Sequence, residues 1–128
     1  MSNKTIISTP KAPAPIGPYN QAVRIGDLIY TSGQIPLDLV TGEIVPGGVG
    51  AQTRQVLTYV KAILEEAGSS LDKVVKSTVF LQNMKDFPEM NIVYAEFFAE
   101  KTAPARSTIQ VAALPKGVDV EIEVIAAV

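Results

Sequence analysis

The clearest hydrophobic pattern in the chain is the alternation at its C-terminal end. From 118 to 128 every second residue is apolar, which is typical of a strand with one buried face. Glu121 lies on the opposite face of this strand. A shorter β-prone run at 107–111 precedes it, and a turn at 114–117 separates the two. We therefore predict an antiparallel hairpin that brings Arg106, just before the first run, close to Glu121.

Four further β-prone runs lie at 5–8, 19–25, 28–34 and 74–81. Gly26 and Asp27 separate the second run from the third and predict a two-residue hairpin turn. Ser32 and Gly33 are unusual inside a strand. A glycine there indicates a bulge, a close approach by another backbone or a ligand, or simply the end of the strand.

The segment 9–18 is predicted to be a loop, because it carries Pro10, Pro13, Pro15 and Pro18, and proline cannot donate to a strand ladder. It could protect a sheet edge or form the rim of a pocket, and the sequence favours the first interpretation. The segment 35–50 is rich in glycine and proline and is predicted to be a second loop, leading into a helix.

Two amphipathic helices are predicted, at 51–67 and 91–100, each with one apolar stripe. The first stripe is Thr53, Val56, Leu57, Val60, Ile63, Leu64 and Ala67, and the second is Ile92, Ala95, Phe98 and Ala99. The resulting order β-β-β-α-β-α-β-β predicts an α+β fold, with one sheet and both helices on a single face. The other face of the sheet is too polar for a core and too apolar to stay wet, which favours self-association.

Composition narrows the class of protein. The length of 128 residues predicts a single domain over 1–128, and 47% hydrophobic with 19% charged residues is typical of a globular chain. The net charge is −2 and no basic stripe is present, so we expect no nucleic-acid surface. No apolar run is long enough for a bilayer and 1–5 lacks a signal-peptide core, so the protein is expected to be cytoplasmic, with no membrane partner.

The chain contains neither His nor Cys. This excludes a thiol nucleophile, a disulfide and the commonest metal ligands, so we expect no metal and no cofactor. Catalysis would have to use Arg, carboxylates, Tyr, hydroxyls, amides, backbone groups or water. Taken alone, Arg106 and Glu121 would be surface residues, Asn91 a helix cap and Tyr19 a packing residue.

Several separated motifs nevertheless occur together, in an order and spacing that resemble one family. They are Ile16-Gly17-Pro18-Tyr19, Ser32-Gly33-Gln34-Ile35-Pro36, Pro104-Ala105-Arg106-Ser107 and Glu121-Ile122-Glu123. Together they resemble the RidA/YjgF/YER057c/UK114 family of reactive intermediate deaminases, over essentially the whole chain. The resemblance implies a chorismate-mutase-like fold and a homotrimer with a site at each subunit interface. It also implies hydrolysis of the 2-imino acids 2-iminobutanoate and 2-iminopropanoate to 2-keto acids and ammonia.

The resemblance assigns roles to individual residues. Arg106 matches the arginine that holds the substrate carboxylate, and Glu121 matches the carboxylate near the attacking water. The pocket-lining positions correspond to Tyr19, Ser32, Gly33 and Asn91, together with Thr108, which stands where many members have Cys. We expect Asn91 to come from the neighbour of the chain that supplies Arg106. Two alternatives stay open, namely a related enzyme acting on another small carboxylate and a metabolite-binding or regulatory trimer.

Overall fold

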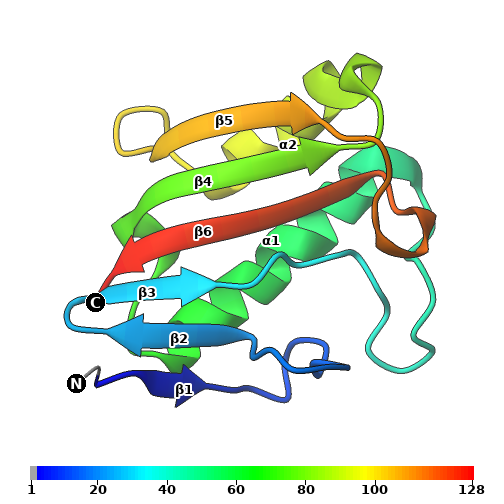
Figure 1. Ribbon diagram of the computed structural model, residues 1–128. Coiled ribbons are helices and arrows are strands. Elements are labelled where there is room, and N and C mark those ends of the chain that lie inside the picture. Colours follow the sequence, from blue (N-terminus) through cyan, green and yellow to red (C-terminus); the bar gives the residue numbers. More distant parts are fainter. Residues whose placement is uncertain (1–2) are drawn as a thin grey trace.

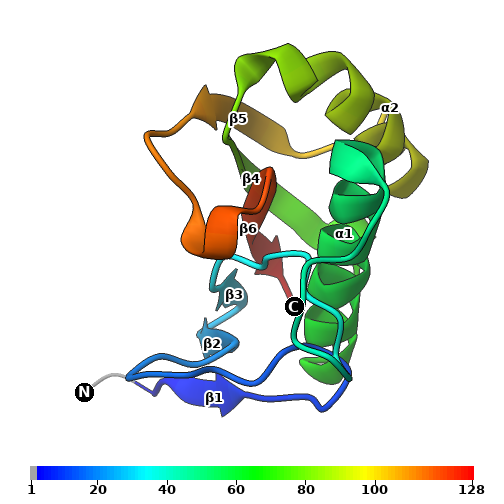
Figure 2. The same cartoon turned by 90° about the vertical axis from the view of Figure 1, so that its right-hand side faces the viewer.

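The computed structural model describes residues 3–128, which form a mixed six-stranded sheet with two α-helices packed against one face (Figures 1 and 2). Residues 1 and 2, which belong to the predicted domain and to the segment searched for a signal peptide, lie outside the described residues. The predicted order of elements and the α+β fold with both helices on one side are confirmed. The elements are β1 (Thr5–Ile7), β2 (Ala22–Ile25), β3 (Leu28–Thr31), α1 (Gly48–Glu66), η1 (Leu71–Lys73), β4 (Val74–Leu81), η2 (Met84–Asp86), α2 (Phe87–Phe97), β5 (Ala105–Gln110), η3 (Pro115–Gly117) and β6 (Val120–Ala127).

The predicted hairpin at Gly26 is confirmed, because β2 and β3 pair antiparallel and Ile25 lies opposite Leu28. Gly26 has a φ of 57°, in the left-handed region that a tight hairpin turn requires and that glycine adopts without strain. Both strands are shorter at their far ends than predicted. β3 ends at Thr31, immediately before Ser32 and Gly33.

The predicted hairpin between the last two strands is wrong. The strand order is β1-β2-β3-β6-β4-β5, so β4 lies between β6 and β5. β4 pairs parallel with β5 and antiparallel with β6. The cause is α2, which carries the chain back across the sheet, so that β5 runs beside β4 in the same direction. β6 then pairs with the other edge of β4 and joins it to the N-terminal strands.

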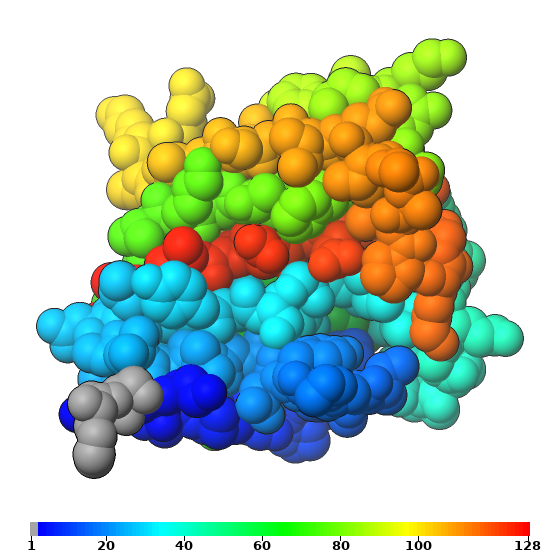
Figure 3. All heavy atoms as spheres, viewed as in Figure 1, coloured from blue at the N-terminus to red at the C-terminus, as the bar shows by residue number. Residues whose placement is uncertain are grey.

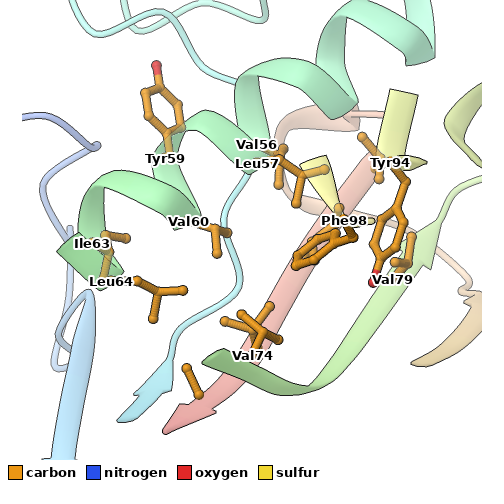
Figure 4. Packing of buried hydrophobic residues seen from close by; sticks show 14 of the residues in the cluster. Val56, Leu57, Tyr59, Val60, Ile63, Leu64, Val74, Val79, Tyr94 and Phe98 are labelled. Carbon is orange, nitrogen blue, oxygen red and sulfur yellow. The ribbon is translucent and has the colours of Figure 1, made fainter. Parts of the chain in front are cut away.

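The core lies between α1 and the sheet. The apolar stripe of α1 is buried as predicted, and Val56, Leu57, Val60, Ile63 and Leu64 are all fully buried. In Figure 4 these side chains lie over the sheet on the same side as the β4 residues Val74 and Val79. Gln52, which is not part of this stripe, is also buried. Its amide oxygen accepts a hydrogen bond from the backbone N–H of Asp119 at 2.8 Å, and its amide nitrogen donates one to the Asp119 carboxylate at 3.0 Å.

The predicted apolar stripe of the second helix is wrong. α2 begins at Phe87, with Pro88 in its first turn, four positions before the expected start. Its buried residues are Met90, Val93 and Tyr94, whereas Ile92 is 69% exposed. The buried face is the one that carries Met90, Val93 and Tyr94, and Ile92 and Ala95 lie on the other side of the helix, in contact with solvent. Phe98 is buried as expected, just beyond the helix end.

The sheet face away from the helices is open and mixed in character, as expected. Figure 3 views the molecule from this side. Strand alternation places on it the half-buried Glu121 and the exposed Glu123, together with the exposed apolar residues Ile6, Ile25, Leu28, Tyr30 and Ile109. Apolar side chains spread over four strands are therefore left in contact with solvent in the isolated chain.

Candidate functional site

Arg106 lies on β5, on the side of the sheet that carries the helices. Its register partner on β4 is the fully buried Ser77. The guanidinium carbon lies 4.6 Å from the ring centre of Tyr94 and 5.4 Å from that of Phe87. Nη1 donates a hydrogen bond of 2.7 Å to Oδ1 of Asn91. Two aromatic faces and one amide of the α2 region therefore fix the direction of this charge.

The guanidinium of Arg106 is not paired with a carboxylate. Within residues 3–128 the one ion pair joins Arg54 to Glu96. A guanidinium has several N–H donors in a rigid fork, and Arg106 uses only part of them on Asn91. Arg106 also lines a recess, together with Asn91, Tyr94, Ala95, Phe98, Glu100, Ala103 and Pro104. The recess can therefore receive a small anion such as a carboxylate.

A buried hydrogen bond supports the aromatic platform under Arg106. The hydroxyl of Tyr94 lies 2.8 Å from Oγ of Ser77, and both residues are buried. Burial raises the pKa of Tyr94, and the Ser77 bond and the Arg106 charge act in the opposite direction. No pattern in the sequence pointed to Phe87, Tyr94 or Ser77 as site residues. Tyr94 lies three residues after Asn91, so helical spacing alone could have placed the two together.

Glu121 lies on β6 and faces the open side of the sheet, opposite Phe80 of β4. Burial raises the pKa of its carboxyl group, and the nearby charge of Glu123 adds to the effect. The carboxylate packs directly against Gly33, because a Cβ at that position would lie 1.9 Å from Oε2 of Glu121. Gly33 therefore allows the Glu121 side chain to approach its backbone closely, whereas the sequence had suggested the approach of another backbone or of a ligand. The simpler interpretation also holds, because β3 ends before Gly33.

A cleft surrounds Glu121 and brings together Tyr19, Ser32 and Gly33 from the set of candidate residues. The Ser32 hydroxyl donates to the backbone oxygen of Asn20 at 2.5 Å, which leaves its lone pairs free to accept a hydrogen bond. The Tyr19 hydroxyl accepts from the backbone N–H of Ile16 at 3.4 Å. This cleft therefore presents hydroxyl groups beside a carboxylate whose burial favours the protonated form.

The candidate residues thus form two groups on opposite sides of the sheet. Ser77, the partner of Arg106, is buried under the helices, whereas Phe80, the partner of Glu121, faces the open side. The expectation that Arg106 and Glu121 meet within one chain is wrong for this reason. The expectation that Asn91 comes from another chain than Arg106 is also wrong, because the two side chains bond each other within the chain.

Thr108 follows Arg106 on the same side of β5, since its register partner is the buried Val79. Its Oγ1 is buried and has no hydrogen-bond partner among the described residues. A hydroxyl in that position is unusual, because buried polar groups normally find a partner. Thr108 therefore adds an unused donor and acceptor on the Arg106 side of the sheet.

Residues 3–128 contain no cluster of acidic side chains with the grouping of a metal site. Within the same residues, neither helix combines the length and the apolar character that crossing a membrane requires.

Comparison with known proteins agrees with the motifs. The model of the family described as Endoribonuclease L-PSP matches residues 9–128. A Bos taurus protein named 2-iminobutanoate/2-iminopropanoate deaminase is 51% identical over 123 residues, covering 96% of this chain and 89% of that protein. The chain belongs to the RidA/YjgF/YER057c/UK114 family.

Solved structures of RidA-like proteins have the same fold. A Yersinia pestis protein, YyfA, described as a protein of unknown function of the conserved Rid family, superposes with a TM-score of 0.93 at 48% identity, covering 98% of this chain and 99% of that one. Escherichia coli TdcF with bound serine gives a TM-score of 0.90 at 49% identity, covering 97% and 98%. The resemblance recognised in the motifs therefore extends over the whole described chain.

Proposed function

We propose that this protein hydrolyses 2-imino acids, with 2-iminobutanoate and 2-iminopropanoate as the expected substrates. The reaction adds water across the carbon–nitrogen double bond and releases a 2-keto acid and ammonia. Metals and cofactors have no part in it, because the imine carbon is already electrophilic. The protein has to hold the substrate and direct one water molecule.

The observation that carries the proposal is the state of Arg106. Its guanidinium is oriented by Tyr94 and Asn91, and no carboxylate within residues 3–128 neutralises it. Every 2-imino acid carries a carboxylate next to the reacting carbon, and a guanidinium binds a carboxylate through two parallel charged hydrogen bonds. Two relatives add support, since one is named a deaminase of such compounds and TdcF holds serine, another small carboxylate.

In this proposal Glu121 handles the protons. Its carboxylate accepts a proton from water while the water oxygen bonds to the imine carbon. The same proton then passes to nitrogen, which has taken up the electron pair of the double bond, so that a carbinolamine forms. The Glu121 carboxylate next accepts the hydroxyl proton as the carbon–oxygen double bond forms, and passes it to nitrogen as the carbon–nitrogen bond breaks, so that ammonia leaves. The raised pKa of Glu121 brings the group closer to the pH at which it must both accept and return a proton. Ser32, with free lone pairs, accepts a hydrogen bond from the substrate nitrogen.

We further propose that each site is shared between chains of a closed homotrimer. Arg106 and Glu121 lie on opposite sides of one sheet, so a single chain does not offer both groups to one small substrate. The open face with its exposed Tyr30 and Ile109 supplies apolar surface for a neighbouring chain. A neighbour placed there would bring its own Arg106 recess toward the Glu121 cleft.

A coupled assay tests the activity. Threonine dehydratase with threonine releases the imine, and 2-ketobutyrate formation is followed with and without this protein. Acceleration beyond spontaneous hydrolysis is expected, and it should be lost in Arg106→Ala. A native rate in Arg106→Ala would remove the carboxylate anchor from the mechanism. Binding of a 2-keto acid without any acceleration would favour the metabolite-binding alternative, and turnover of other carboxylates only would favour the related enzyme.

A reassembly experiment tests the shared site. Arg106→Ala and Glu121→Gln chains, each inactive alone, are unfolded together and refolded at equal amounts. Random assortment leaves about a quarter of the interfaces native at both positions, so activity should return to about a quarter. The matched control mixes Arg106→Ala with Asn91→Ala. Arg106 and Asn91 bond each other within one chain, and no chain in this mixture carries both, so activity should stay at the level of the two parents. No recovery in the first mixture, with chain exchange verified by mass-tagged subunits, would show that the site is not shared.

A further inference from the structure

The proline-rich segment 9–18, called the arm below, is held in place by one side chain. Gln21 is 3% exposed, and its amide oxygen accepts the backbone N–H of Thr9 at 2.7 Å. Its amide nitrogen lies within hydrogen-bond distance of three backbone oxygens, those of Thr9 at 3.0 Å, Ala12 at 3.1 Å and Pro13 at 2.9 Å. The prolines of the arm cannot donate the backbone hydrogen bonds of a strand ladder. The Gln21 amide instead supplies hydrogen bonds to the backbone of the arm.

Gln21 also reaches the other wall of the Glu121 cleft. Its backbone oxygen accepts the N–H of Ser32 at 2.9 Å, and the neighbouring Asn20 oxygen accepts the Ser32 hydroxyl at 2.5 Å. Gly33, against which the Glu121 carboxylate packs, is the next residue. The side chain of Gln21 therefore holds the arm, while its backbone holds Ser32, and both line the same cleft.

The arm supplies an apolar part of that cleft. Pro13, Pro15 and Ile16 line it from the arm, and Leu37 and Leu39 line it from the loop after β3. Ile16 is 83% exposed, so it is held at the cleft by the course of the arm rather than by packing. In Figure 3 the blue arm, the cyan segment after β3 and the orange loop before β6 surround a hollow on the open side of the molecule.

We propose that Gln21 is a positioning residue that holds the arm as the side-chain wall of the site, and that it thereby sets the preference for imino acids with longer aliphatic side chains. This inference rests on the proposed function. The carboxylate and the reacting carbon are held by charged and polar groups, which leaves the apolar lining to contact the rest of the substrate. Without the amide of Gln21 the backbone oxygens of Thr9, Ala12 and Pro13 lose their shared donor.

The first test measures the arm directly, without any substrate. Lys11 lies in the arm and is exposed, so trypsin can report on local opening there. Gln21→Met removes the amide at similar volume, and Gln52→Met is the matched control, because Gln52 is also buried and hydrogen-bonded but lies outside the cleft lining. Cleavage after Lys11 should accelerate about tenfold or more in Gln21→Met and stay unchanged in Gln52→Met. Equal cleavage in both variants would overturn the proposal.

The second test measures selectivity. The imines of alanine and leucine are generated in situ by an amino-acid oxidase, and kcat/KM is compared between them. In Gln21→Met the preference for the larger imine should fall about tenfold, the discrimination that one to two buried methylene groups provide. Ile16→Ala, which removes part of the wall itself, should change the ratio in the same direction, and Gln52→Met should keep it.

The outcomes separate this inference from the proposed function. If the unaltered protein accelerates neither imine, the proposed function fails, and the trypsin result still decides whether Gln21 holds the arm. If it hydrolyses both and Gln21→Met keeps the native ratio, only this inference fails. Gln21→Glu, which keeps the size and the Thr9 N–H bond but loses the donors, serves as the second variant. If neither variant gives a cooperative melting transition, Gln21 belongs to the global fold and the proposal is wrong.

Discussion

Gly33→Ala is the sharpest single perturbation of the Glu121 cleft, because it moves a carboxylate without changing its chemistry. Gly33 does not belong to the glycines with positive φ, so alanine fits the backbone. The added Cβ would lie 1.9 Å from Oε2 of Glu121, whereas ordinary contact begins at 3.4 Å, so the oxygen has to move by about 1.5 Å. A displacement of about 1 Å at a reacting group costs about 100-fold in rate. We therefore expect kcat to fall about 100-fold, with KM little changed because the proposed function assigns substrate binding to Arg106.

Folding should tolerate the same change. All the atoms that the Cβ would meet belong to the flexible, half-buried side chain of Glu121, so stability should fall by less than about 1 kcal/mol, partly offset by the stiffer unfolded chain. Gly17→Ala is the matched control, because its Cβ would lie 3.6 Å from the nearest Tyr19 ring carbon, an ordinary contact. The imine assay gives kcat, and thermal unfolding gives stability. A folded Gly33→Ala protein with kcat within about threefold of native would refute the placement of Glu121 at the reacting carbon.

Three further predictions follow from the site. Arg106→Lys should lose most activity in the imine assay, because an ammonium makes no paired contact with a carboxylate, and retention of native kcat/KM would argue against bidentate binding. Glu121→Gln should melt at a higher temperature than the native protein at pH 7. Burial raises the pKa of the folded Glu121, so the contribution of this group to stability is complete below its unfolded pKa of about 4.3 and is lost as the pH rises through the folded value. The advantage of Glu121→Gln should therefore vanish near pH 4, and an equal advantage at both pH values would contradict the assigned cause. Lys116, which lines the Glu121 cleft, has a φ of 58°, so Lys116→Gly should gain about 0.5–1 kcal/mol in urea unfolding, and no gain would mean that this backbone is unstrained.

The positions of individual strands were predictable from local patterns. The β-prone run at 74–81 located β4, and period-two alternation identified the buried face of β6, because alternate side chains of a strand face the core. The stripe of α1 was predictable for the corresponding reason. Its start was not, since the left-handed Gly47 lies directly before the helix and the glycine-rich sequence resembled a loop.

The pairing of distant strands was not predictable from proximity along the chain. β5 and β6 are neighbours in sequence, but the crossover through α2 places β5 beside β4, with which it pairs. The same crossover brings Asn91 and Tyr94 to Arg106, so these contacts depend on tertiary structure. The role of Gln21 also lacked any signal, because a single polar residue between Asn20 and Ala22 does not reveal that its amide will face three carbonyl groups.

The separation of Arg106 from Glu121 has a consequence for how the protein responds to its own concentration. Under the shared-site proposal a dissociated chain carries both groups and yet catalyses nothing, so specific activity should decline as the sample is diluted. Substrate acts against this decline, because a molecule that bridges two chains binds only the assembled form and stabilises it by mass action. The imine would then preserve the assembly that removes it, and its depletion would allow the chains to separate.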